Sequence, residues 1–196
     1  GFERPTKVQA SVIPVALSGR DIMAKSKTGT GKTAAFGLPM LHTLHTSPSP
    51  LAGLILVPTR ELAVQVAREL RELGRFTDLK ITPIYGGQPM RVQADKLAKN
   101  PEIIVGTPGR VMDFHRRGQL DYSGVRYAVL DEVDRMLDIG FRDDIRRILG
   151  AIRQEHQTVF VSATISPEIN RLARQYLKDP AQLELASASL TASQVS

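Results

Sequence analysis

The sequence alternates short, nearly unbroken apolar runs with longer stretches of helical periodicity, and this alternation restricts the fold more than any other feature. The runs at 54–57, 103–105 and 128–130 contain only aliphatic residues, as strands buried on both faces do. Parallel strands need helical crossovers between them. The pattern therefore predicts an α/β fold with a mostly parallel central sheet and helices on both faces.

The expected elements follow from these runs and from the turn residues between them. We expect strands at 21–25, 54–57, 80–85, 102–105, 127–130, 158–161 and 182–185. We expect helices at 5–17, 32–46, 60–73, 90–99, 109–116, 143–152 and 167–177. Gly19 and Gly74 are expected to end the first and third of these helices.

Length and composition are those of a single globular domain. The chain has 196 residues, of which 42% are hydrophobic and 23% charged. No run of about eighteen apolar residues exists, so we expect no membrane span. The absence of cysteine excludes disulfides, thiolate catalysis and cysteine-based zinc sites. The net charge of +6 permits nucleic-acid binding but is weak evidence by itself.

The two ends of the chain suggest a piece of a longer protein. Residues 1–5 neither begin with Met nor form a signal peptide. Residues 186–196 are small and polar, with too little apolar surface to pack. We expect one domain over 1–185, followed by the beginning of an interdomain linker at 186–196.

Polar residues gather directly after the predicted strands. The clusters lie at 26–33, 58–61, 86–87, 107–110, 131–134 and 162–164. In open parallel sheets, ligands bind outside the carboxyl ends of the strands. The clusters therefore predict one shared functional edge.

A phosphate-binding loop is predicted where the first strand meets the second helix. Its residues are Ser26, Lys27, Thr28, Gly29, Thr30, Gly31, Lys32 and Thr33. Gly29 and Gly31 let backbone N–H groups surround phosphate oxygens, and the helix N-terminus adds positive potential. Lys32 is expected to reach the β- and γ-phosphates of a nucleotide, and the Thr33 hydroxyl to hold Mg²⁺.

Ser26 stands where the general phosphate-loop pattern has glycine, and a small residue is expected to be tolerated there. The alternative is a glycine-rich turn before a helix, without a ligand. The strand before the loop and the helix after it favour the nucleotide interpretation.

An acidic cluster, Asp131-Glu132-Val133-Asp134, follows the apolar strand at 127–130. Asp131 is expected to hold Mg²⁺, partly through water, and Glu132 to orient or deprotonate an attacking water. The alternative is the acidic first turn of a helix, which the helix dipole favours. The cluster alone does not decide between these interpretations, but the upstream phosphate loop favours the first.

The ordered set of motifs resembles the N-terminal RecA-like domain of DEAD-box RNA helicases, over nearly the whole chain. The further residues that carry the resemblance are Gly1, Phe2, Pro5, Thr6, Gln9, Pro58, Thr59, Arg60, Glu61, Leu62, Gly86, Gly87, Thr107, Pro108, Gly109, Arg110, Ser162, Ala163 and Thr164. Each short motif is weakly specific, but the set in this order is highly specific.

The resemblance implies ATP and Mg²⁺ as cofactors, with Lys32, Asp131 and Glu132 as the catalytic residues. Besides the phosphate loop, Arg4, Thr6 and Gln9 are implied to bind the nucleotide, with the Gln9 amide reading the adenine edge. The implied contacts to the RNA backbone are Pro58, Thr59, Arg60, Gly86, Gly87, Thr107, Pro108, Gly109 and Arg110. Ser162 and Thr164 are implied to couple ATP state to RNA grip through hydrogen bonds to Asp134.

The chain departs from the family pattern in three ways. Val133 replaces the alanine of the name motif, and we expect it to be tolerated. The adenine-stacking aromatic lies upstream of the first residue, so nucleotide affinity is expected to suffer. The second RecA-like domain, the implied partner that supplies arginines to the γ-phosphate, is absent. We therefore expect a monomer that binds ATP weakly, hydrolyses it near background and unwinds nothing.

The resemblance further implies an intracellular protein, expected in the cytoplasm or, in a eukaryote, alternatively in the nucleus. Two other functions remain open. One is a different P-loop NTPase, such as a DNA translocase or a small-molecule kinase, which Gln9 and the segments 58–62 and 107–110 disfavour. The other is an RNA-binding module without catalysis, which the intact Lys32 and Glu132 disfavour.

Two residue sets also have simpler interpretations. Without the resemblance, Arg60 would be read as a surface arginine paired with Glu61 or Glu69. His42 and His45 have the spacing of metal ligands on a helix, but no third ligand is near in sequence, which favours an ordinary helix surface.

Overall fold

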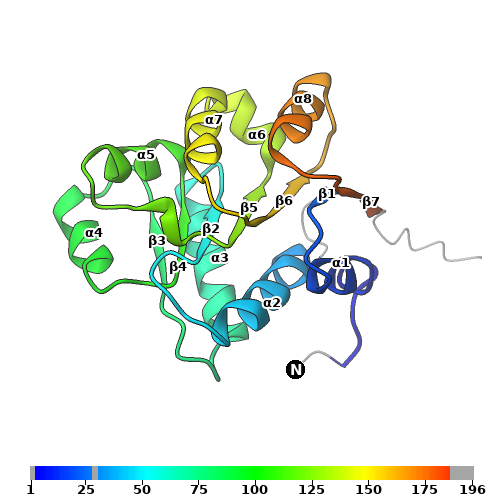
Figure 1. Cartoon of the computed structure of the whole chain (residues 1–196), viewed down its shortest axis with the longest axis horizontal. Helices are drawn as coiled ribbons and strands as arrows, with labels where there is room; N and C mark the ends of the chain where they lie inside the picture. The colour runs from blue at the N-terminus through cyan, green and yellow to red at the C-terminus, as the bar shows by residue number, and fades with distance from the viewer. Residues whose placement is uncertain (1–2, 28–30, 186–196) are drawn as a thin grey trace, which may run out of the picture.

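A seven-stranded sheet forms the centre of the chain in the computed structural model, which describes residues 3–27 and 31–185 (Figure 1). Every paired strand runs parallel to its neighbours. The strand order is β3-β4-β2-β5-β6-β1-β7. The strands are β1 (Ile22–Ser26), β2 (Gly53–Leu56), β3 (Ile81–Ile84), β4 (Ile103–Gly106), β5 (Tyr127–Asp131), β6 (Gln157–Ser162) and β7 (Ala181–Leu185). The predicted parallel sheet is confirmed.

Helices cover both faces of this sheet, as predicted. They are α1 (Lys7–Leu17), α2 (Lys32–His45), α3 (Arg60–Leu73), α4 (Met90–Leu97), α5 (Pro108–Arg116), α6 (Val133–Ile139), α7 (Arg142–Ala151) and α8 (Pro167–Tyr176), with a 3₁₀ turn η1 (Tyr122–Gly124). In the view of Figure 1, α1, α2 and α3 lie below the sheet, and α5, α6, α7 and α8 lie above it. Each group of helices encloses its own apolar cluster against one face of the sheet.

The central strands are buried along their whole length, which explains their unbroken apolar runs. All residues of β2, β4 and β5 are buried. Alternate residues contribute to opposite clusters: Ile55 lies in the cluster with α1–α3, and Leu54 and Leu56 lie in the other. A strand packed on both faces cannot alternate polar and apolar residues, so the sequence pattern and the layer structure have the same cause.

All the predicted strands and helices are present, with ends shifted by at most two residues. The structure also contains α6, a seven-residue helix that the sequence analysis did not predict. It begins within the acidic cluster and ends at Gly140, whose φ of 103° suits a glycine. The predicted linker at 186–196 lies outside the described residues. Within the described ranges, no helix has the length and apolar character that crossing a membrane requires.

Candidate functional site

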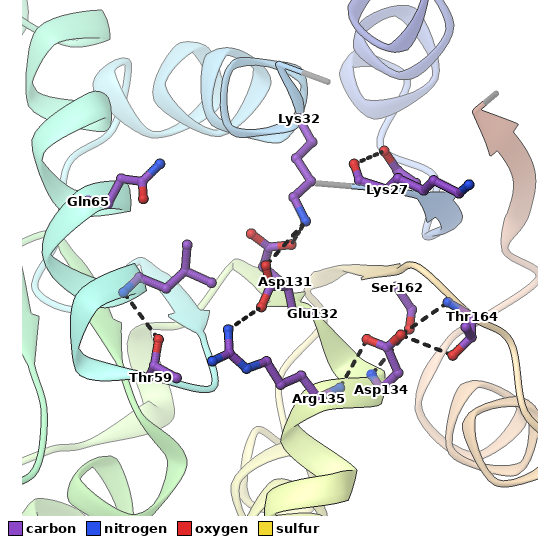
Figure 2. Close-up of polar contacts among 12 residues, drawn as sticks. Lys27, Lys32, Thr59, Gln65, Asp131, Glu132, Asp134, Arg135, Ser162 and Thr164 are labelled. Atoms are coloured by element: carbon purple, nitrogen blue, oxygen red, sulfur yellow. Dashed lines mark hydrogen bonds and ion pairs between the residues drawn. The ribbon is translucent and has the colours of Figure 1, made fainter. Parts of the chain in front are cut away.

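Three charged side chains lie close together at the carboxyl edge of the sheet: Lys32, Asp131 and Glu132. Lys32 begins α2 directly after Gly31, which has a left-handed φ of 76°. Its Nζ lies 3.0 Å from Asp131 Oδ1 and 3.9 Å from Glu132 Oε1 (Figure 2). Because β5 and β1 are separated only by β6, the end of one strand faces the loop that follows the other. The predicted catalytic residues therefore form one cluster.

Asp131 is the last residue of β5, and its side chain is 1% exposed. Burial raises the pKa of its carboxyl group, an effect that the nearby Lys32 ammonium opposes. Apart from that ammonium, its two oxygens find no hydrogen-bond partner among the described residues. A buried carboxylate with free lone pairs is an oxygen ligand of the type that Mg²⁺ prefers.

The donor set around Asp131 fits a magnesium ion held together with phosphate oxygens. Thr33, the second residue of α2, has a half-buried side chain. No cluster of three or more His, Cys, Asp or Glu side chains suited to a metal occurs among residues 3–27 and 31–185. Mg²⁺ commonly uses one or two carboxylates plus substrate phosphates, so a fuller protein cage is not required. His42 and His45 belong to no such cluster within the described part of the chain.

Glu132 is held in an unusual backbone conformation between two cations. Its φ of 55° and ψ of 52° are left-handed, which is uncommon for a residue other than glycine. Arg135, one turn further along α6, places Nη1 3.4 Å from Glu132 Oε2. The sequence analysis did not identify Arg135, although its position three residues after Glu132 at a helix start was a usable signal.

Asp134 connects the end of β5 with the segment after β6. Its backbone N–H donates to Ser162 Oγ at 3.1 Å. Its Oδ2 accepts from Thr164 N at 3.1 Å and from Thr164 Oγ1 at 3.0 Å (Figure 2). The predicted hydrogen bonds are present, but Ser162 reaches the backbone of Asp134 rather than its carboxylate. Val133, which lies between Glu132 and Asp134 in the chain, is fully buried at 0% exposure.

Gln9 lies beside the phosphate loop, but its amide is engaged within the protein. Its Oε1 accepts from Thr6 N at 3.1 Å, and Thr6 Oγ1 accepts from Gln9 N at 3.2 Å. This reciprocal pair is a capping box at the start of α1. Gln9 Nε2 also donates to Gly31 O at 3.4 Å. The sequence analysis assigned Gln9 only to adenine, although Thr6-x-x-Gln9 carried the capping signal.

The structure describes some of the remaining predicted nucleotide contacts. Ser26 is buried at the end of β1, and its hydroxyl donates to the Lys27 carbonyl at 3.3 Å. Lys27 and Arg4 are exposed. Thr28, Gly29 and Thr30 lie outside the described residues.

A cavity of about 660 Å³ opens beside the phosphate loop, between α1, α2 and α3. Its lining includes Gln9, Gly31 and Thr33 from the loop side. It also includes Leu73 and Phe76 from the end of α3, and Phe76 is 88% exposed. The cavity has the size of sites that bind small molecules and continues from the phosphate loop.

The predicted RNA contacts lie at the other half of the same edge, after β2, β3 and β4, which are adjacent in the sheet. Thr59 caps α3 by accepting from Leu62 N at 3.3 Å. Thr107 occupies the corresponding position before α5, but its side chain makes no capping bond. Pro108 is the first residue of α5, where its missing N–H is tolerated. Pro58 is buried, and Gly109 is half-buried.

Arginines on both sides of the Gly86-Gly87 turn approach it. The Arg60 guanidinium carbon lies 5.3 Å from the centre of the Tyr85 ring, and Arg110 Nη1 donates to Gln88 O at 3.0 Å. Gly87 has a φ of 84°, which favours glycine. Arg60 is an exposed residue at the start of α3, but the structure shows no ion pair with Glu61 or Glu69 within the part of the chain that it describes.

The sequence analysis missed Gln93, a fully buried amide that fixes this turn. Gln93 Oε1 accepts from Tyr85 N at 2.8 Å, and Gln93 Nε2 donates to Tyr85 O at 2.9 Å. Tyr85 lies just beyond β3, which is an edge strand. The Gln93 side chain therefore takes the place of the backbone hydrogen-bond partner that a neighbouring strand would provide. Its only sequence signal is its position on the inward stripe of α4, between Met90 and Leu97.

These observations define a class of protein. An all-parallel sheet, a lysine at the start of the helix after a phosphate loop, and adjacent carboxylates at the end of a nearby strand are features of a P-loop nucleotide-binding domain. A second group of polar residues lies along the same edge, after β2, β3 and β4.

Comparison with known proteins identifies the family. The DEAD/DEAH box helicase family model matches residues 6–172, and the chain belongs to this family. It is 45% identical over 97% of its length to the DEAD-box ATP-dependent RNA helicase CshA of Bacillus cereus. It is 42% identical over its full length to CshA of Bacillus subtilis. The chain spans 36% and 40% of these relatives.

Solved structures agree with this assignment. A hypothetical ATP-dependent RNA helicase from Sulfolobus tokodaii superposes with a TM-score of 0.88 at 37% identity, covering 94% of this chain and 54% of the other. A DEAD box protein from Methanococcus jannaschii gives a TM-score of 0.87 at 42% identity, with 94% and 50% covered. The fold is therefore a RecA-like helicase domain, as the sequence predicted.

Proposed function

We propose that this chain is the ATP-binding and RNA-gripping first RecA-like domain of an ATP-dependent RNA helicase. The observation that carries the proposal is the approach of Lys32 to Asp131 and Glu132, at 3.0 and 3.9 Å, on a parallel sheet of helicase type. A longer protein containing this domain and a second one would remodel RNA duplexes. Alone, the domain would bind ATP weakly and release little phosphate.

In the proposed complex, Lys32 leaves its carboxylate partners and pairs with the β- and γ-phosphates. Thr33 and Asp131 would hold Mg²⁺, and the burial of the Asp131 carboxylate, whose only close partner among the described residues is the Lys32 ammonium, supports this assignment. The ion would offset phosphate charge. Glu132 would orient the attacking water and accept its proton, with Arg135 fixing the direction of the carboxylate.

The base is assigned to the side of the phosphate loop where Gln9 lines the cavity. The Gln9 amide can both donate to and accept from an adenine edge, and Arg4 and Thr6 stand on the same segment. Its present bonds to Thr6 and Gly31 mean that adenine binding must share or exchange these partners. Guanine reverses the donor and acceptor at the same ring edge, so GTP is expected to bind less well.

RNA is assigned to the half of the edge formed after β2, β3 and β4. The contacts are proposed to be sequence-neutral, since phosphate contacts carry no base code. Thr164 and Ser162 would transmit the state of the nucleotide through Asp134, to which both are hydrogen-bonded. Duplex DNA translocation and small-molecule phosphorylation are the alternatives, and a comparison of RNA with DNA binding separates the first from the proposal.

The proposal is tested by measuring phosphate release from purified domain, with and without single-stranded RNA. We expect background rates from the domain alone, because an arginine finger supplied by another domain contributes about 10³–10⁵ in rate. Adding a second RecA-like domain from a relative, in trans or through a linker, should restore RNA-stimulated release. Glu132→Gln should remove that release and leave ATP binding intact. Robust RNA-stimulated release from the isolated domain would contradict the division of the machinery between domains.

A further inference from the structure

Arg60 differs from the other well-placed arginines of the functional edge in how it is held. Arg110 donates to the Gln88 carbonyl and Arg135 to the Glu132 carboxylate. The Arg60 side chain makes no hydrogen bond or ion pair with residues 3–27 or 31–185, yet its guanidinium lies against the Tyr85 ring at 5.3 Å. Arg60 is exposed, whereas Tyr85 is buried at 7% exposure.

A ring face orients a guanidinium without using its donors. The five N–H groups of arginine lie in the guanidinium plane and point outward from it. Attraction between the cation and the ring quadrupole holds the group near the aromatic side chain. A carbonyl or carboxylate partner would instead consume the edge that a phosphate needs. Arg60 is therefore restrained by its neighbour and still has its donors available for a bidentate phosphate contact.

The ring is itself fixed at the backbone. Tyr85 follows β3, an edge strand, where its N–H and C=O have no second strand to pair with. The buried Gln93 amide satisfies both groups, at 2.8 and 2.9 Å. A position satisfied in this way loses little freedom when a ligand binds nearby.

Gly87 keeps the space beside Arg60 open. A Cβ on Gly87 would lie 3.9 Å from Arg60 Nη1, in ordinary contact, and the φ of 84° disfavours any side chain. With glycine in this place, the backbone turn reaches the guanidinium edge without covering it. The same turn is tied to Arg110 through Gln88.

We propose that Tyr85 is a positioning residue for nucleic-acid binding, presenting the Arg60 guanidinium edge-on to a backbone phosphate, with Gln93 and Gly87 fixing the geometry. This inference rests on the proposed RNA function of the same edge and adds residues that act through Arg60. The ligand class is a single-stranded polynucleotide phosphate backbone. The phenol hydroxyl has no part in the arrangement, because the interaction uses the ring face.

The test uses the isolated domain and a fluorescent ten-nucleotide oligouridylate, with affinity measured by anisotropy at several salt concentrations. Tyr85→Phe should bind as the wild type does. Tyr85→Leu should bind about two- to fivefold more weakly, the size expected for an exposed cation–π contact. If the phosphate contact is lost, the slope of log affinity against log salt should fall by about 0.7, the value of one contact on a single strand. Tyr176→Leu, which removes a half-buried tyrosine on α8, serves as the control.

A double-mutant cycle separates positioning from general damage. In an Arg60→Ala background, Tyr85→Leu should have no further effect on RNA affinity, because its influence passes through Arg60. In the absence of RNA, the NMR signal of the Arg60 Nε–H group should lose its ring-current shift in Tyr85→Leu and keep it in Tyr85→Phe.

Three outcomes would overturn the inference. They are equal affinity and salt slope for wild type and Tyr85→Leu, additive losses in the cycle, or an equal loss in Tyr85→Phe. The first of these, with wild-type RNA binding intact, leaves the proposed function standing. Absence of wild-type RNA binding at low salt would remove both.

Discussion

The two halves of the functional edge are held in different ways. In the nucleotide half, the charged groups are already bound to one another: Lys32 to Asp131, and Arg135 to Glu132. In the RNA half, Arg60 rests against Tyr85 and keeps its hydrogen-bond donors free of residues 3–27 and 31–185. In the first half the charged groups are paired with one another, whereas in the second half the Arg60 guanidinium keeps its donors available.

This difference determines what each ligand must do. A nucleotide has to exchange an internal ion pair for a phosphate contact, so its net affinity is the difference between two strong interactions. At the proposed RNA site, a phosphate would meet the Arg60 guanidinium, so its contact would displace only water and counterions. The comparison predicts that substitutions in the two halves have separable effects.

The largest expected effect follows from Lys32→Ala. Removing a charge that pairs with phosphate should lower ATP and ADP affinity about ten- to hundredfold, the equivalent of a charged hydrogen bond. RNA affinity should stay within about twofold, because Lys32 lies in the other half of the edge. Titration calorimetry with the nucleotide and Mg²⁺ measures the first quantity, and anisotropy measures the second.

Lys25→Ala is the matched control for this change. Lys25 Nζ lies 3.1 Å from Glu184 Oε1, but both side chains are largely exposed, so this ion pair contributes little to stability. Equal nucleotide affinities for wild type and Lys32→Ala would remove the phosphate assignment and, with it, the comparison between the halves.

The next effect concerns the rigidity of the RNA half. Gln93→Leu leaves the buried Tyr85 N–H and C=O without partners, which should lower the unfolding free energy by about 2–4 kcal/mol. The variant should also weaken RNA binding while leaving nucleotide affinity nearly unchanged. Urea denaturation gives the stability, with Gln175→Leu on the exposed side of α8 as the control. A Gln93→Leu domain of wild-type stability would show that the turn does not depend on the amide.

The sequence predicted the fold because each strand can be recognised from its own consecutive residues. A run such as 103–105 is apolar throughout only if both faces of the strand are covered, and the helices between the runs require parallel order. The phosphate-loop motif could be recognised in the same way, since its glycines, lysine and threonine lie within residues 29–33. Features carried by adjacent residues are visible without a structure.

Some of the contacts that the sequence did not predict join residues from different elements, and others are local features that were assigned another role. Tyr85 and Arg60 meet because β3 and α3 pack together, and the tyrosine alone gave no sign of an arginine neighbour. α6 was missed because its first turn is the acidic cluster, which the analysis assigned to the site rather than to a helix. The capping box of Gln9 was visible but was outweighed by its proposed role at adenine.

A smaller effect is expected from Arg135→Ala in a protein that also contains a second RecA-like domain. Arg135 is 57% exposed, so its pairing with Glu132 should contribute modestly, and turnover should fall about two- to fivefold. Nucleotide affinity should change less than turnover, because Arg135 would orient Glu132, the proposed general base, and would not contact the phosphates. Arg135→Lys should recover part of the rate. Steady-state phosphate release measures the change, and a loss in affinity without a loss in rate would contradict it.

The smallest effects distinguish two threonines within the RNA half. Thr59 caps α3, so Thr59→Ala should lower the unfolding free energy by about 1 kcal/mol. Thr107 is 8% exposed and its side chain makes no capping bond, so Thr107→Ala should lower the unfolding free energy less than Thr59→Ala does. Both hydroxyls stand at the start of a helix on the proposed RNA path, where a backbone phosphate is a favourable ligand. Both variants should therefore weaken RNA binding, and Thr107→Ala should do so with the smaller loss of stability. Thermal unfolding and anisotropy on the same samples separate the two quantities. A Thr107→Ala variant with full RNA affinity would place the RNA path away from the N-terminus of α5.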